Sequence, residues 1–428
     1  MASNLNAAAP SSQPVTQSPF EWLAGGLFFG KNSKGGIESI DSCKDVMSLL
    51  TGLSDNLGAI LAEQSAGTET FVTTEQPESG AAKPTPSTFL AARLSRLRFL
   101  LYDERRVSLQ QESRKSAPTV AGTALQGLTG KNLRDLMPRL LENLYVLPFE
   151  SRKHVAAIFN YLMVSGLDGS DAVLYHPIMV GWASYVEANY ERFMNVIVNG
   201  HDTSSHGATD IGLHSGAMYR SCLRHASLYR LLVSTTASLE QWVYPFLDVY
   251  VHVPNFDVSS DAMESLKLFF TAGGDRVPDE ESQQIMAELA AEFLTRDYEE
   301  IWDKRFNASL LADSANYMTR RVALQILSTV LLTRSNYQVM IRYVASRANL
   351  MLVMHLLRDT SPHISMDAFH VFKVFVANPN KPPEVVKILQ DNQVKLCRYL
   401  TTLHQDKEAS DTQFRDEKAL IIATIEGL

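Results

Sequence analysis

The chain has 428 residues, of which 45% are hydrophobic and 20% are charged, an ordinary composition for a soluble globular protein. Its formal net charge of -8 argues against a nucleic-acid binder whose affinity comes from bulk positive charge. The three cysteines lie far apart and form no CxxC pair, which argues against a zinc ribbon or a disulfide scaffold and suggests a reducing compartment.

Residues 1–19 are rich in Ala, Ser, Pro and Gln and contain no apolar signal-peptide core, so a disordered tail is expected there. No run of about 18 apolar residues occurs, so no membrane span is expected. Polar, low-complexity composition predicts two flexible insertions, at about 63–87 and 197–210. We therefore expect a cytoplasmic, mainly helical protein.

Apolar residues at helical spacing predict helices over Ile37–Leu61 and Thr88–Arg106, and residues 107–130 are expected to be loop. From Asn132 onward helices are expected almost without interruption. The expected breaks are 197–212, 254–260, 272–278 and the prolines at 379, 382 and 383. No alternation of period two is found, so we expect an all-α fold without a sheet.

The stretch Met366–Lys381 is apolar almost all round, so it predicts a helix that is buried between neighbours on both sides. Proline cannot continue a helix, and the Asn378-Pro379 pair is expected to end this one. The apolar positions at helical spacing are Phe369, Phe372, Phe375 and Val376, with Val371 and Val374 on a second face.

Internal similarity indicates a repeat. Asp261–Phe270 aligns with Asp367–Val376, and a third copy runs through Ala323 and Leu324, 45 positions before Ala368 and Phe369. Asn349 and Val353 recur 43 positions later as Asn392 and Leu396. This period, with two or three helices per unit, is typical of armadillo or HEAT repeats, which stack into a solenoid. The alternative is chance similarity among Leu-rich helices. We therefore assign residues 20–428 to one armadillo/HEAT-like helical-repeat domain.

Two segments resemble sites of small-ligand chemistry. Gly25–Asn32 has the Gly-x4-Gly-Lys spacing of a P-loop, but Asn32 replaces the Ser or Thr that holds magnesium and no apolar strand precedes it, so a packed aromatic segment is favoured. A second stretch contains possible zinc ligands in an apparent loop, and a solvated loop is favoured over a metal site. Its members are His201, Asp202, His206, Asp210 and His214.

No nucleophile elbow and no EF-hand loop is present in the sequence, so we expect no enzyme, no cofactor and no metal. Basic positions on the repeat helices are more informative. Arg321, Gln325 and Thr329 form a polar line at i, i+4 and i+8, with Arg334 near the end of the helix. Stacking is expected to bring Met351, Met354, His370 and Lys373 close to this line. Basic residues beside Met and Phe suit a peptide with an aromatic and a carboxylate, although a solvated face is the plain alternative.

Several motifs in one order resemble the calcium-binding protein 39 scaffold family, also called mouse protein 25. The likeness covers roughly residues 130–428. The motifs that carry it are Phe149-Glu150-Ser151-Arg152-Lys153, Ser215-Gly216-Ala217-Met218, Phe256–Ala262, Asn316–Arg321, Asp367–Lys381 and Gln413-Phe414 with Asp416-Glu417-Lys418.

The resemblance implies a non-catalytic armadillo-like scaffold. Such scaffolds hold a sterile-twenty or germinal-centre kinase or pseudokinase active on a concave face, and bind its Trp-Glu-Phe-like tail in a C-terminal groove. They serve cell polarity, morphogenesis and division. By position, Arg321, Met354 and Arg334 match the tail groove, and Phe256 and Tyr317 match the kinase-facing surface.

Gln325 and Met351 stand where the family pattern has basic residues, so carboxylate recognition would lean on Arg321. His370 and Lys373 are weaker candidates for the groove. These departures are the support for a different function, a general adaptor for trafficking or cytoskeletal partners. An enzyme is the third alternative, and it would need metal at His201, His206 and His214.

Overall fold

The computed structural model describes residues 43–65, 85–111, 131–164, 182–202, 204, 209–274, 277 and 279–428. Every element assigned among these residues is a helix, so the all-α helical-repeat fold expected from the sequence is confirmed. They belong to one compact unit, Ser42–Leu428. The tail at 1–19, the P-loop-like segment at 25–32, His206 and most of the 63–87 stretch lie outside the described residues.

The N-terminal part contains helices of uneven length. They are α1 (Cys43–Ser65), α2 (Pro86–Gln111), α4 (Lys131–Glu142), the 3-10 turn η2 (Leu144–Val146), α5 (Phe149–Val164), α7 (Tyr190–Asn199) and α9 (Thr209–Cys222). α2 extends five residues beyond the expected end at Arg106, into the segment expected to be loop. Both edges of the 197–210 stretch are helical, because Ile197–Asn199 belong to α7 and Thr209–Asp210 to α9.

Four repeats follow, each ending in a long helix. The first contains α10 (Ala226–Val233), α11 (Thr236–Trp242), α12 (Tyr244–Asp248), η3 (Tyr250–His252) and α13 (Phe256–Phe270), and the second contains α14 (Glu280–Arg296), the π-helix η5 (Glu299–Leu310) and α15 (Tyr317–Leu332). The third contains η6 (Arg334–Asn336), α16 (Tyr337–Ala345), α17 (Arg347–Leu357) and α18 (Pro362–Ala377), and the fourth contains α19 (Pro383–Asp391), α20 (Gln393–Thr402), α21 (Gln405–Glu408) and α22 (Thr412–Glu426).

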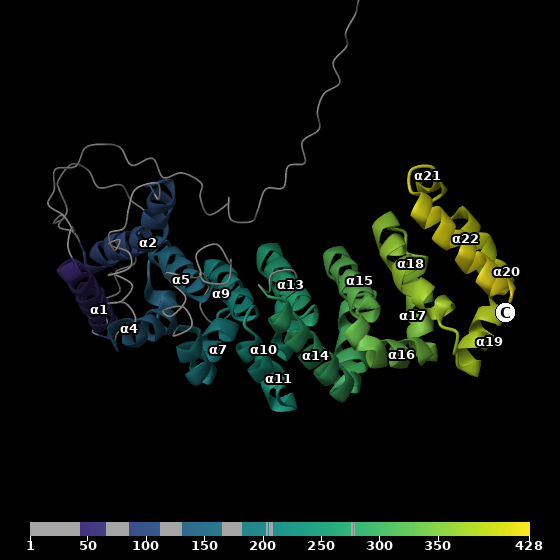
Figure 1. Ribbon diagram of the computed structural model, residues 1–428, viewed down its shortest axis with the longest axis horizontal. Coiled ribbons are helices and arrows are strands. Elements are labelled where there is room, and N and C mark those ends of the chain that lie inside the picture. The colour runs from purple at the N-terminus through teal and green to yellow at the C-terminus, as the bar shows by residue number, and fades with distance from the viewer. Residues whose placement is uncertain are drawn as a thin grey trace, which may run out of the picture. The chain divides into compact units, whose positions relative to one another are not determined.

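The long helices form one row, which we call row A: α5, α9, α13, α15, α18 and α22, each packed against the next. Figure 1 shows α9 to α22 side by side in chain order. A second set, η5, α17 and α20, is row B. Its members are joined at the repeat period, because Asn307 Nδ2 donates to Asn349 Oδ1 (3.1 Å) and the Tyr399 hydroxyl donates to the Leu357 carbonyl (2.7 Å).

Side-chain caps fix where the row A helices begin. Asn255, Asn316, Ser361 and Asp411 each accept a hydrogen bond from the backbone N–H three residues later, at the start of α13, α15, α18 and α22. The expected break at 254–260 is therefore wrong in part, since α13 already begins at Phe256. Because Asn255 caps the helix, the loop covers only the first two residues of the expected break. The polar residues among 257–260 lie at the start of α13.

The caps also put the repeats in one register. The sixth residue after the cap is acidic in α13, α18 and α22, and each time it pairs with a basic side chain of the preceding row A helix. In the α9–α13 pair, Gly216 leaves the room for this carboxylate, because a Cβ there would lie 1.7 Å from Asp261 Oδ2. The pairs are Arg220–Asp261 (2.7 Å), Arg321–Asp367 (3.5 Å) and Lys373–Glu417 (2.7 Å).

The helix α18 is the buried centre of the third repeat, as its sequence predicts. Phe369, Phe372, Phe375 and Val376 are fully buried, and the helix ends at Ala377, before Asn378-Pro379. Neighbours on both sides, α15 and α22, cover it within row A, and α17 packs against it as well.

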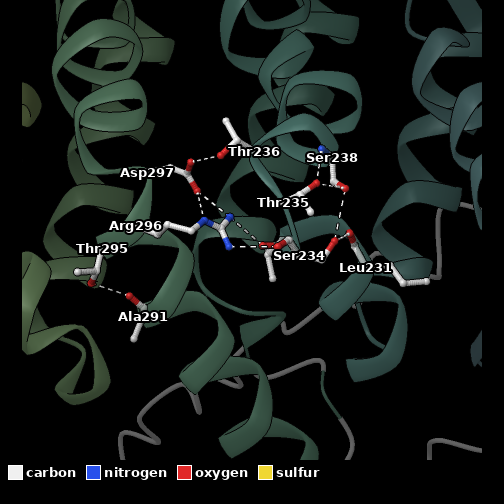
Figure 2. Close-up of polar contacts among 10 residues, drawn as sticks. Leu231, Ser234, Thr235, Thr236, Ser238, Ala291, Thr295, Arg296 and Asp297 are labelled. Atoms are coloured by element: carbon white, nitrogen blue, oxygen red, sulfur yellow. Dashed lines mark hydrogen bonds and ion pairs between the residues drawn. The ribbon is translucent and has the colours of Figure 1, made fainter.

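Polar bonds also join helices of successive repeats at the end of α14. Figure 2 shows Arg296 and Asp297 beside the α10–α11 junction. Arg296 Nη2 donates to the Val233 carbonyl (3.0 Å), and Asp297 Oδ1 accepts a hydrogen bond from the Thr236 hydroxyl (2.6 Å). Because a cation meets the carbonyls at the C-terminus of α10, this contact also satisfies groups that the helix leaves unpaired.

The Arg220–Asp261 pair generates a stability prediction. Both side chains are only 15% exposed, and Arg220 also donates to Ser265 Oγ (2.8 Å). Arg220→Met leaves Asp261 largely buried without its cation, so we expect the free energy of unfolding to fall by about 3 kcal/mol in urea titrations. The matched control, Arg192→Met, removes a solvent-exposed pair with Glu142 and should lower it by less than about 1 kcal/mol. If both substitutions lowered the free energy of unfolding equally, burial of the Arg220–Asp261 pair would not be what makes it stabilising.

His201 generates a prediction of pH dependence. The ring is fully buried, stacks on Tyr250 and donates Nδ1 toward the carbonyls of Ile197 and Val198, and burial lowers its pKa to about 4. In the unfolded chain the pKa of this histidine is near 6.5, so between pH 4 and pH 6.5 the unfolded chain binds more protons than the native state. The stabilisation by neutral His201 is present above pH 6.5 and is lost as the pH falls toward 4.

We expect His201→Phe to reduce the loss of stability between pH 7 and pH 5 by about 2 kcal/mol, because it removes that titration. The measurement is urea unfolding at both pH values. His201→Leu, a second apolar replacement of the same ring, should reduce the slope by the same amount. Identical slopes for His201→Phe and the unchanged chain would show that His201 is not the titrating group.

Candidate partner-binding surfaces

The nine residues expected to bind a partner divide between two helix rows. Row A carries six of them, α17 of row B carries two, and the turn η6, which packs against α14, α15 and α16, carries one. The row A residues are Phe256 on α13, Tyr317, Arg321 and Gln325 on α15, and His370 and Lys373 on α18. The others are Arg334 in η6 and Met351 and Met354 on α17. The structure therefore does not bring Arg321 and Met354 onto one helix row.

Phe256 and Tyr317 are exposed because of the caps that precede them. Each is the first helical residue after a capping asparagine, where the side chain leaves the helix axis before the packed part of the row begins. Their exposed fractions are 63% and 40%, large for aromatic side chains. Because α13 and α15 are packed neighbours, the two rings present apolar surface on adjacent helices of row A.

The polar line on α15 faces α18 and is partly satisfied within the chain. Arg321 Nε lies 3.5 Å from Asp367 Oδ2 without a hydrogen bond, and Gln325 Nε2 donates to the same oxygen at 3.3 Å. The side chain of Arg321 is still 36% exposed, so the rest of its guanidinium can donate to a partner carboxylate. Asp367 offsets part of its positive charge, and sequence reasoning missed this residue as a member of the site.

His370 and Lys373 lie between α18 and α22 and are held by internal contacts. Lys373 Nζ donates to Glu417 Oε2 at 2.7 Å. Burial, and then the nearby Lys373 ammonium, lower the pKa of His370, so its ring is neutral at physiological pH. Both side chains are half-buried, and their first role is to join two helices of row A.

Row B offers a different, mostly apolar surface. Met351 on α17 is 52% exposed and Met354, one turn later, is half-buried. Val394 on α20 is 80% exposed and stands 43 positions after Met351, at the same place in the next repeat. The repeat offset of 43 residues pairs Val394 with Met351 and could have identified Val394 from the sequence, but the sequence analysis does not include it. We call Met351, Met354 and Val394 the row B patch. Arg334 is an exposed cation and pairs with no acid among the described residues.

The histidine-rich stretch does not assemble ligands in the part of the chain that the structure describes. His201 is inside the core, and no group of three or more His, Cys, Asp or Glu among the described residues is placed to hold a metal ion. His214 is half-buried and Asp210 pairs with Arg152 at 2.9 Å, so their roles are in helix packing.

Comparison with known proteins places the chain among relatives that share most of its length. The model of the Mo25-like family matches residues 85–428. The degreening-related gene dee76 protein of Auxenochlorella protothecoides is 35% identical, over 70% of this chain and 82% of its own. The Mo25-like protein of Schizosaccharomyces pombe is 34% identical over 69% and 78%, and the human calcium-binding protein 39-like protein is 31% identical over 68% and 76%. None of the described helices is long and apolar enough to cross a membrane.

Proposed function

The chain belongs to the Mo25-like family, and we propose that it is a non-catalytic scaffold that binds and activates a sterile-twenty or germinal-centre kinase or pseudokinase in the cytoplasm. The observation that carries the proposal is the pair of exposed aromatic residues, Phe256 and Tyr317, on adjacent helices of row A. Signalling for cell polarity, morphogenesis or division is the role that the resemblance implies for such a scaffold.

Activation follows if row A binds the active conformer of the kinase better than the inactive one. A partner that is active about 1% of the time needs roughly 10⁴-fold preference to become about 99% active. The surface beside Phe256 and Tyr317 supports this role, because rigid aromatic side chains lose little freedom when they bind. The partly exposed Arg321 adds a charged contact at its edge.

The tail of the kinase would bind at the row B patch, where methionine adapts its shape to aromatic side chains. The resemblance adds Arg334, an exposed arginine on the turn η6 that packs against α14, α15 and α16, for a carboxylate of the peptide. Two linked contacts raise the overall affinity, because the second one forms at high effective concentration. This arrangement assigns the catalytic domain to row A and the tail to row B.

A general adaptor for trafficking or cytoskeletal partners is the second candidate. The feature that favours it is that Gln325 and Met351 are uncharged where the family pattern has basic residues. Each departure removes a positive charge that an acidic tail could bind. Stimulation of a kinase by the purified chain separates the two candidates, because an adaptor without kinase function gives none.

We expect the purified chain to raise the activity of at least one purified sterile-twenty-type kinase of the same organism by tenfold or more. The assay is phosphate transfer to a generic substrate at saturating scaffold. A pseudokinase partner would instead show as a rise in its nucleotide affinity. If no member of this kinase class binds or responds, the proposed function is wrong.

The two surfaces should also separate by mutation. Met354→Ala should weaken binding of the kinase's C-terminal tail peptide about tenfold and leave the catalytic domain bound, because it removes apolar contact from row B only. Arg321→Ala should weaken binding of the catalytic domain and leave the tail peptide bound. Lys304→Ala, at an exposed position on η5, is the control for both. Binding is measured by isothermal calorimetry, and loss of tail binding by Arg321→Ala would place Arg321 in the tail groove instead.

A further inference from the structure

A six-residue sequence occurs twice in the chain, once in α2 and once in α15. It reads Arg-Arg-Val-Ser-Leu-Gln at 105–110 and Arg-Arg-Val-Ala-Leu-Gln at 320–325. The two copies differ at one position, where α2 has Ser108 and α15 has Ala323. The partner-binding surfaces include residues of the α15 copy only, so the copy in α2 has no role in the proposed function.

The copy in α15 lies within a packed part of row A. Ala323 and Leu324 are fully buried, and Arg320 Nη1 donates to Asp359 Oδ2 at 2.8 Å. About two further turns of α15 follow the copy before the helix ends at Leu332. A residue at position 323 could reach the active site of another protein only if the middle of this helix unfolded.

The copy in α2 lies at the end of its helix instead. α2 ends at Gln111, so Ser108 begins its last turn. The last four carbonyls of a helix have no partner within it, and helix ends therefore open more easily than the middle. The last buried leucine among the described side chains of α2 is Leu97, about two turns before the copy. Opening of the last turn leaves the packing of this leucine unchanged.

The copy in α2 has the pattern that arginine-directed serine/threonine kinases accept. Arg105 and Arg106 precede Ser108 by three and two positions, and the apolar Leu109 follows it. Guanidinium groups bind carboxylates through paired hydrogen bonds, so a kinase with an acidic substrate groove selects arginines at fixed distances from the acceptor hydroxyl. No other serine or threonine in the sequence has arginine at both positions.

We propose that Ser108 is a phosphorylation site for a serine/threonine kinase whose substrate groove is acidic. In the transfer, the Ser108 hydroxyl oxygen forms a bond to the γ-phosphorus of ATP, and the bond from that phosphorus to the bridging oxygen breaks. ADP leaves, and the hydroxyl proton passes to a carboxylate of the kinase. The site goes beyond the proposed function, because Ser108 belongs to none of the partner-binding surfaces.

The test uses the full chain, ATP and the purified catalytic subunit of cyclic-AMP-dependent protein kinase, an arginine-directed enzyme, with phosphopeptides mapped by mass spectrometry. We expect phosphate on Ser108 in at least half of the chains. Ser108→Ala, which makes the α2 copy identical to the α15 copy, should remove this phosphopeptide. The double substitution Arg105→Ala and Arg106→Ala should slow transfer to Ser108 about thirtyfold or more, because it removes both guanidinium groups.

Two results overturn the proposal. The first is an absence of phosphate on Ser108, and the second is transfer to Ser108 that is equally fast without the two arginines. Neither result bears on activation of a kinase by the chain, which depends on the surfaces of rows A and B. Failure of the phosphorylation site is therefore distinguishable from failure of the proposed function.

Ala323→Ser is the matched control for the position in the fold. Combined with Ser108→Ala, it moves the complete six-residue pattern from the end of α2 to the middle of α15. We expect transfer to position 323 at less than about a twentieth of the rate at Ser108, because the middle of a packed helix opens rarely. Thermal unfolding checks that the variant folds.

Two synthetic peptides complete this control. A peptide of residues 317–328 with Ala323→Ser should accept phosphate about as fast as a peptide of residues 102–113, because neither is held in a folded helix. Slow transfer in the folded chain and fast transfer in the peptide support selection by position. Equal rates at positions 323 and 108 in the folded chains would show that the end of α2 does not select the site.

Discussion

The carboxylate that follows the caps of α13, α18 and α22 by six residues is the contact on which the register of these long helices depends. A cap alone fixes where a helix starts, and apolar packing alone allows neighbouring helices to slide along their ridges. The charged pair fixes both the start of the helix and its position on its neighbour. Asp261, Asp367 and Glu417 each lie six residues after a cap and pair with a cation of the preceding helix. In repeats that contact only their neighbours, such a local pair helps to fix the register, since no distant part of the fold can do so.

These ion pairs also determine which charged side chains remain available to a partner. Where such a carboxylate is present, it uses charges that a partner could otherwise bind, as Asp367 does with Arg321 and Gln325. Where it is missing, in α15, Val322 stands at that position, and Phe256 and Tyr317 at the starts of α13 and α15 remain exposed. Row B has no such series of carboxylates, and its exposed Met351 and Val394 give it a separate character.

Much of the fold was predictable because the repeat period is written in the sequence. The offsets of 45 and 106 residues align three row A helices correctly, since Asn255, Asn316 and Ser361 cap them at those same offsets. The break expected at 254–260 was too long because an Asn cap starts a helix within a polar segment. The sequence favours a solvated loop for the histidine stretch, but His201 packs on Tyr250. A polar composition does not reveal that the first residue of this stretch is buried against the next repeat.

The sequence by itself determined the helices, their period and the residues at each cap, because these depend on contacts a few positions apart. It also singled out Phe256 and Tyr317 through a family resemblance. Only the tertiary structure decided which polar residues are spent on internal pairs and which helix row each candidate occupies. Pairs such as Arg321–Asp367 join residues 46 positions apart on different helices. Their partners depend on how the helices stack, which the local pattern does not encode.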